Sequence, residues 1–118
     1  MKLLTQSQHA KLLANGRKQE PLRGTEAEID FKPVVKLFTP DGVCTWLLTE
    51  LDPEDPDIAF GLCDLGMQCP ELGSVRLSEL ATIRGRFGLP VERDCHWTAD
   101  RTLMAYARVA WASGRIQA

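Results

Sequence analysis

The sequence predicts an α+β domain with an antiparallel sheet of four or five strands, an N-terminal helix, a short middle helix and a C-terminal helix packed on one face of the sheet. Alternating apolar residues recur between positions 29 and 97, and the connections between these runs have hairpin length. The sequence shows no strand–helix–strand repeat of the kind that builds a parallel sheet. A length of 118 residues suits one domain, covering residues 1–118.

The first predicted helix covers about residues 6–15. Thr5 and Gln8 have the spacing of a capping box, in which each side chain accepts a hydrogen bond from the other residue's backbone N–H. Leucines at helical spacing follow, and Gly16 is a typical helix stop. The polar stretch 17–28, which includes proline and glycine, should be an exposed connection.

Two strands joined by a tight turn form a predicted hairpin. Apolar residues alternate in the first strand, 29–38. The sequence TPDG at 39–42 has proline second and glycine fourth, which is typical of a type I turn between antiparallel neighbours. In the second strand, 43–51, Trp46 shares a face with Cys44 and Leu48, and we expect that face to line the core.

The middle of the chain predicts two more strands and a short helix. In the third strand, 57–66, bulky apolar residues alternate with small ones. A turn at 70–73 leads to a short fourth strand at 74–77, and Ser78 can cap a helix of roughly residues 79–84.

The last two predicted elements are a strand at 89–97, where alternation resumes, and the C-terminal helix at about 101–113. The helix has a broad apolar side that should cover one face of the sheet, and Gly114 ends it.

Charge is unevenly distributed along the chain. The formal net charge is −2, but residues 1–40, 41–73 and 74–118 carry +3, −8 and +3. Five carboxylates lie close together near the connection between the second and third strands: Glu50, Asp52, Glu54, Asp55 and Asp57. We hypothesise that this exposed acidic loop docks a basic protein partner by long-range attraction. A solvated turn without a binding role is the alternative.

A second hypothesis is nucleic-acid binding. Arg101, Arg108 and Arg115 are spaced by seven, which places them within about 40° of one another on an ideal helix. Such a stripe could contact phosphates, although the net charge of −2 argues against strong nonspecific affinity. An ordinary solvated helix face is the alternative.

A third hypothesis is a metal-assisted hydrolase. The predicted last strand would project three alternating side chains from one face: Glu92, Asp94 and His96. The alternative is an ordinary solvent-exposed face of the sheet, which shows the same alternation. Arg93 falls on the apolar face, so we expect a carboxylate beside it, Glu50 or Glu79. The acidic segment does not fit a calcium-binding loop. Without a phosphate loop or nucleophile elbow in the sequence, we expect no enzymatic activity.

The four cysteines, none of which forms a C-x-x-C pair, are expected to be reduced thiols, with a structural zinc site as the less favoured alternative. Cys44 and Cys95 lie in apolar alternations that suit buried thiols. No apolar run approaches the roughly 20 residues of a membrane span, and the start lacks the continuous apolar segment of a secretory signal. We therefore expect a cytoplasmic protein with no cofactor.

Four segments occur in the order TWLLTELDPEDPD, FGLCDLG, ELGSVRLSEL and FGLPVERD. Together they resemble a bacterial family of unknown function, DUF2958, over about residues 1–97, which leaves the C-terminal helix outside the resemblance. Members of that family are carried largely by plasmids, integrative elements and phages. The resemblance therefore implies an accessory role in a mobile genetic element, and it implies no established activity.

Overall fold

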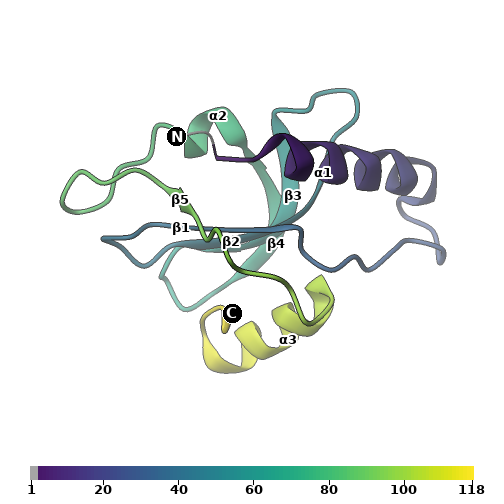
Figure 1. The fold of residues 1–118 in the computed structure, drawn as a ribbon. Helices are drawn as coiled ribbons and strands as arrows, with labels where there is room; N and C mark the ends of the chain where they lie inside the picture. The colour runs from purple at the N-terminus through teal and green to yellow at the C-terminus, as the bar shows by residue number, and fades with distance from the viewer. Residues whose placement is uncertain (1–2) are drawn as a thin grey trace.

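A computed structural model describes residues 3–118 of the chain (Figure 1). Five antiparallel strands form one sheet in the order β4-β3-β2-β1-β5. Figure 1 shows helices α1 (Gln6–Gln19) and α2 (Leu77–Leu80) on one side of the sheet and α3 (Leu103–Ser113) on the other. The predicted α+β class, with three helices and an antiparallel sheet, is confirmed. Within the described residues, no helix combines the length and apolar character needed to cross a membrane.

Helix α1 begins as predicted but ends later. Thr5 and Gln8 form the capping box, with each backbone N–H donating to the other side chain at 3.0 Å. The helix passes through Gly16, continues to Gln19 and is followed by the short 3₁₀ helix η1 (Glu20–Leu22). Gly16 therefore does not stop the helix. It is buried against β2, where a Cβ atom would lie 1.8 Å from the carbonyl oxygen of Leu51.

Strands β1 (Val35–Phe38) and β2 (Thr45–Leu51) form the predicted hairpin, and the N–H of Gly42 donates to the carbonyl of Thr39 at 3.2 Å in the turn. The first strand begins later than the predicted residue 29. The N–H and carbonyl of Ile29 are bonded to the side chain of Gln19, so the chain there follows α1 instead of the sheet.

Both faces of β2 are buried, which the single predicted core face did not anticipate. Trp46, Leu48 and Leu51 pack in one cluster with Leu12 of α1. On the opposite face, Leu47 packs in a second cluster with Leu62 and the apolar side of α3: Leu103, Tyr106, Ala107 and Ala110. The sheet is thus the middle layer between two cores, and the Trp46 face is only one of them.

Strands β3 (Ile58–Asp64) and β4 (Glu71–Arg76) pair throughout the length of β4. Helix α2 begins at Leu77 and ends at Leu80, earlier than the predicted range 79–84. Ser78 does not cap it. Instead Ser78 lies inside the helix, and its N–H and hydroxyl donate to the carboxylate of Asp57 at 2.9 and 2.6 Å. An aspartate distant in sequence therefore performs the capping role that was assigned to a local serine.

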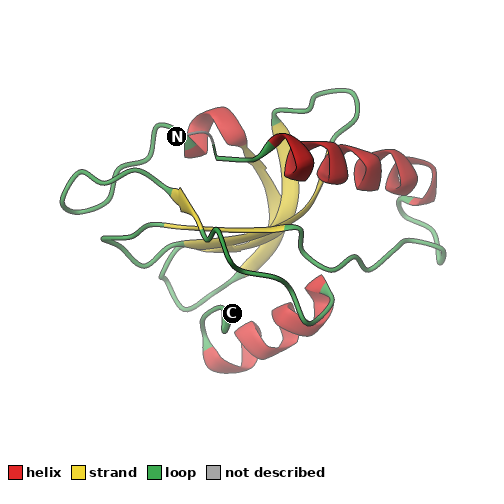
Figure 2. Cartoon of the chain, in the orientation of Figure 1, coloured by secondary structure: helices red, strands yellow, loops and turns green. Residues whose placement is uncertain are grey.

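Strand β5 (Glu92–Arg93) is only two residues long and pairs with β1 at the sheet edge. Figure 2 shows that the chain on both sides of β5 is loop, so the predicted strand 89–97 is mostly irregular. Thr102 caps α3 by accepting from the N–H of Ala105. Gly114, at φ 81°, ends the helix in the left-handed conformation that glycine adopts without steric penalty.

Candidate functional site

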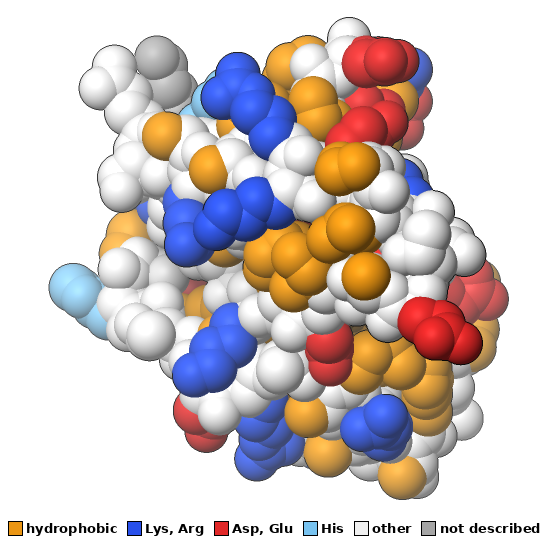
Figure 3. Space-filling model, turned by 90° about the vertical axis from the view of Figure 1, so that its right-hand side faces the viewer, with side chains coloured by type: hydrophobic (Ala, Val, Ile, Leu, Met, Phe, Trp, Pro, Cys, Tyr) orange, Lys and Arg blue, Asp and Glu red, His pale blue; other side chains and the backbone are white. Residues whose placement is uncertain are grey.

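The connection between β2 and β3, residues 52–57, is hereafter the acidic connection. It contains four of the five predicted carboxylates: Asp52, Asp55 and Asp57, all half-buried, and Glu54, which is exposed. Figure 3 shows Lys and Arg side chains mainly on one half of a face of the molecule, whereas the largest group of Asp and Glu side chains lies at its upper right. On this face, therefore, most of the basic side chains lie apart from the largest acidic group.

Arg76 pairs with two of these carboxylates. Its Nη1 lies 3.1 Å from Asp55 Oδ2 and 3.6 Å from Asp57 Oδ2. The hydrogen bonds from Ser78 hold the pKa of Asp57 below its ordinary value, and Arg76 adds to this effect. Asp55 and Asp57 thus help to position α2, and their charges are partly balanced by one guanidinium.

Asp52 and Glu54 have no ion-pair partner within residues 3–118. Asp52 Oδ1 accepts from the N–H of Glu54 at 2.9 Å, which closes a tight local turn. Pro53 and Pro56 restrict the backbone on either side of Glu54. The acidic connection is therefore held in one shape and presents unbalanced negative charge.

Glu50, the fifth predicted carboxylate, does not belong to this surface. Leu48 pairs with Gly61 and Glu50 with Phe60, so Thr49 is an extra residue that forms a bulge in β2. The bulge turns Glu50 to the α3 side of the sheet, where it is 2% exposed. Arg23 Nη2 donates to Glu50 Oε2 at 3.1 Å, and burial nevertheless raises the pKa of Glu50.

Glu50 lies at the wall of a cavity of about 290 Å³. Part of the wall is apolar and comes from the segment after η1, from β3 and from α3, including Phe31, Phe60 and Met104, and Glu28 and Asp30 also line the cavity. The side chain of Asn15 donates to the carbonyl of Thr49 at 2.9 Å, which ties α1 to the bulge. This arrangement can hold a small group between apolar side chains and carboxyls, but it contains no nucleophile paired with a base.

The three arginines of the predicted stripe do not share a helix face. Helix α3 covers only residues 103–113, so Arg101 precedes it, Arg115 follows its left-handed cap, and Arg108 alone lies on it. Arg101 is 3.6 Å from Asp100 and stacks over the ring of Tyr106 at 5.6 Å. Spacing by seven places residues together only while the helix continues, and Thr102 and Gly114 end it on both sides.

Glu92, Asp94 and His96 also do not project together, because β5 ends at Arg93. Asp94 lies 3.7 Å from Lys36 Nζ, and His96 is exposed in the loop that follows. Residues 3–118 contain no group of three His, Cys, Asp or Glu residues that could hold a metal ion. Arg93 donates to the carbonyl of Leu3 at 3.2 Å, whereas Glu50, one of its two predicted partners, pairs with Arg23.

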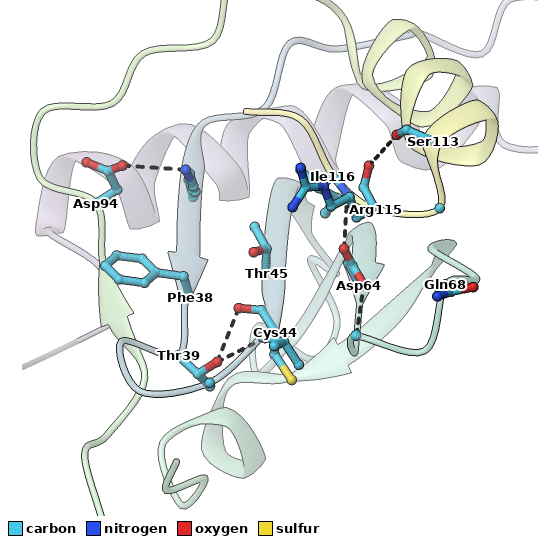
Figure 4. Close-up of a pocket in the computed structure, with 15 residues that line it drawn as sticks. Phe38, Thr39, Cys44, Thr45, Asp64, Gln68, Asp94, Ser113, Arg115 and Ile116 are labelled. Carbon is cyan, nitrogen blue, oxygen red and sulfur yellow. Dashed lines mark hydrogen bonds and ion pairs between the residues drawn. The ribbon is translucent and has the colours of Figure 1, made fainter. Parts of the chain in front are cut away.

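A pocket of about 730 Å³ lies between the β1–β2 hairpin and the segment after α3 (Figure 4). The buried carboxylate of Asp64 accepts from the N–H groups of Gly66 at 2.9 Å and Ile116 at 3.0 Å, so it anchors that segment to the sheet. The charged side chains that line the pocket have no net charge in sum: Lys36, Arg115, Asp64 and Asp94. No histidine lines it. The pocket offers hydrogen-bonding groups without a paired nucleophile and base.

The four cysteines are free thiols, of which Cys44 and Cys63 are half-buried and Cys69 and Cys95 are exposed. Cys95 is therefore not the buried residue that its alternation predicted, because the strand ends before it. Burial raises the pKa of Cys63 to about 11 and also raises that of Cys44.

Residues 84–90 form a projecting loop between α2 and β5, and none of them is among the predicted site residues (Figure 1). Arg84, Arg86 and Phe87 are all exposed on it. The available signal was the run RGRFG, in which arginines, an aromatic residue and glycines alternate. The sequence pattern predicts only the end of the middle helix near residue 84 and the start of a strand at residue 89.

Comparisons with known proteins place the chain in a family. A family model described as "Protein of unknown function (DUF2958)" matches residues 3–117, so the match includes α3 and extends beyond the motifs at residues 45–94. No curated protein and no solved structure matches the chain. Because the family model covers nearly the whole chain, this protein belongs to the DUF2958 family.

Proposed function

We propose that this protein is a non-enzymatic interaction module that binds a basic protein partner through its acidic connection. The observation that supports this most directly is the charge balance of residues 52–57. Their four carboxylates have one guanidinium partner, Arg76, which leaves a formal charge of −3 in a short, outward-facing segment. Glu50 is not part of the proposed surface, because it is buried with Arg23.

A surface of this kind mainly increases the rate at which the two proteins meet. Clustered charges of one sign attract an oppositely charged partner over roughly 8–10 Å at ordinary ionic strength, and salt weakens that attraction. The turn at Asp52, the two flanking prolines and the bonds from Asp57 to Ser78 hold the carboxylates in place before binding. Less conformational freedom is then lost when the partner docks.

Partner capture from a host lysate tests the proposal with two variants of equal charge. Asp52→Asn with Glu54→Gln removes the two carboxylates that have no ion pair, and asparagine retains the oxygen that accepts from residue 54. Glu26→Gln with Glu71→Gln removes two exposed carboxylates elsewhere. We expect the first variant to lose a partner that the wild type captures at low salt and releases at high salt, and the second to retain it. Equal capture by both variants would reject the proposal.

The cellular setting is part of the same proposal. The proposed accessory role in a mobile genetic element rests on the family resemblance alone, and the proposed cytoplasmic location rests on the sequence, in which no apolar run reaches membrane length. The genes that neighbour this one in its host provide the check. A partner encoded by the same plasmid, integrative element or phage would be expected to present a basic surface.

A further inference from the structure

We propose that the loop of residues 84–90 is a contact site for single-stranded nucleic acid, with a base stacking on Phe87 and phosphates lying against Arg84 and Arg86. This site is separate from the acidic connection. The loop lies against the β1–β2 turn, whereas the acidic connection joins the opposite end of β2 to β3. The two proposals therefore rest on different residues and can fail independently.

Phe87 is 79% exposed, more than any other large hydrophobic side chain in the described chain. Its backbone is nevertheless firmly held. The N–H of Phe87 donates to Asp41 Oδ2 at 2.6 Å, and the N–H of Leu89 donates to the same oxygen at 3.3 Å. Within the loop, Gly85 and Gly88 add backbone hydrogen bonds of 2.8 and 3.0 Å. An aromatic ring is thus presented to solvent on a fixed backbone.

The contact between Asp41 and the loop has an unfavourable part. Asp41 Oδ1 is buried and has no hydrogen-bond partner among the described residues, which is unfavourable for a carboxylate oxygen. The contact is so close that a Cβ atom on Gly85 would lie 1.5 Å from that oxygen. Because the exposed ring of Phe87 buries little apolar surface in return, we infer that its role is to contact a molecule outside the chain.

The chemistry around Phe87 identifies the class of ligand. The guanidinium of Arg86 lies 5.7 Å from the ring centroid, which is within cation–π range, and Arg84 is exposed nearby in the same loop. The sequence has no carboxylate between Glu79 and Glu92, and Asp41 is engaged by the loop amides. A flat aromatic face beside two cations suits a ligand that combines unpaired bases with phosphates. Bases in a duplex are stacked on one another and leave no face free to stack on Phe87.

Fluorescence anisotropy with a labelled oligothymidine, and with the matching duplex, tests the proposal. We expect wild type to bind the single strand more tightly than the duplex at low salt. Phe87→Leu should weaken binding about tenfold, since base stacking on an aromatic side chain contributes about that factor, whereas Phe87→Tyr should bind like wild type. Arg84→Gln with Arg86→Gln should weaken binding and lower the salt dependence, because fewer phosphate contacts release fewer counterions.

Arg108→Gln removes an exposed arginine on α3 and serves as the charge control, with binding expected to equal that of wild type. Circular dichroism and thermal unfolding establish that each variant is folded, and the substituted side chains are exposed. Flat anisotropy curves at low salt, or equal binding by wild type and Phe87→Leu, would overturn the proposal. So would tighter binding to the duplex, or Phe87-dependent binding to anionic vesicles without binding to the oligonucleotide.

Discussion

Gly16 and Glu50 show how single side chains, or the lack of one, determine the layers of this fold. At Gly16 the backbone of α1 approaches the carbonyl of Leu51 too closely for a Cβ atom. At Glu50 a bulge in β2 places a carboxylate on the face opposite Leu48 and Leu51. Both positions were misassigned from sequence, one as a helix stop and one as a surface charge, because each depends on contacts with a distant segment.

Gly16→Ala should destabilise the protein although alanine favours helix. The new Cβ atom would lie 1.8 Å from a backbone oxygen, so α1 must shift away from β2, and overpacking of this kind costs about 1–3 kcal/mol. Urea unfolding measures the effect. Gly73→Ala is the control, since nothing lies within 4 Å of the corresponding Cβ, and it should be neutral or slightly stabilising. Equal stability of Gly16→Ala and wild type would contradict the close contact.

Glu50→Gln should change how stability depends on pH. Burial raises the pKa of Glu50, so the folded state binds this proton more tightly than the unfolded state. The free energy of unfolding therefore decreases as pH rises from the unfolded pKa to the folded pKa, and stays lower above it. Glutamine cannot ionise, so the variant should lack that decrease.

Chemical denaturation at a series of pH values from acid to neutral measures the Glu50 effect. Glu26→Gln is the control, because Glu26 is exposed and lies outside the cavity, and its pH profile should follow that of wild type. The same decrease in Glu50→Gln as in wild type would show that another group causes it.

At the scale of elements, the sequence predicts most of the fold and fewer of its boundaries. The capping box of α1, the TPDG turn and the glycine after α3 are local signals, and each structure that they predict is present. The ends of β1, β5 and α2 depend on tertiary pairing instead. The chain before β1 bonds to Gln19, and α2 is held by Asp57, neither of which a local pattern reveals.

The candidate sites were affected by the same limitation. The arginine stripe required a helix that extends from Arg101 to Arg115, and the acidic hypothesis required carboxylates without internal partners. Four of the five predicted acidic residues do lie together in the acidic connection. Their partner Arg76 comes from β4 and the partner of Glu50 from the segment after η1, so neither ion pair follows from nearby sequence.

Asp57→Asn should weaken the attachment of α2 to the acidic connection at neutral pH. The hydrogen bonds from Ser78 lower the pKa of Asp57, so its charged form contributes stability above the unfolded pKa. That contribution is lost as pH falls through the folded pKa. The variant should therefore be less stable than wild type at neutral pH and approach wild type in acid. Thermal unfolding across this range measures the difference.

Glu54→Gln is the matched control for Asp57→Asn. It removes one charge from the same connection, but its exposed carboxylate has no ion pair within residues 3–118. Its stability should stay close to that of wild type at every pH. A constant difference between Asp57→Asn and wild type, extending into acid, would show that the charge of Asp57 does not stabilise α2.

At the scale of the whole molecule, the topology separates the two proposed surfaces. The antiparallel order places the β1–β2 turn and the loop of residues 84–90 at one end of β2 and the acidic connection at the other (Figure 1). On the face drawn in Figure 3, the largest group of Asp and Glu side chains lies apart from most of the Lys and Arg side chains. The protein can thus present an acidic surface and an arginine–aromatic surface without conflict between them.

The most direct measurement is a titration of the isotope-labelled protein with an oligolysine peptide, followed by amide chemical shifts. At low salt the largest shifts should fall on residues 52–57 and on the adjoining start of α2, and they should shrink at high salt as screening increases. Asp52→Asn with Glu54→Gln should lose most of them. Shifts centred on another surface, or unchanged in that variant, would contradict the claim that the acidic connection is the docking surface.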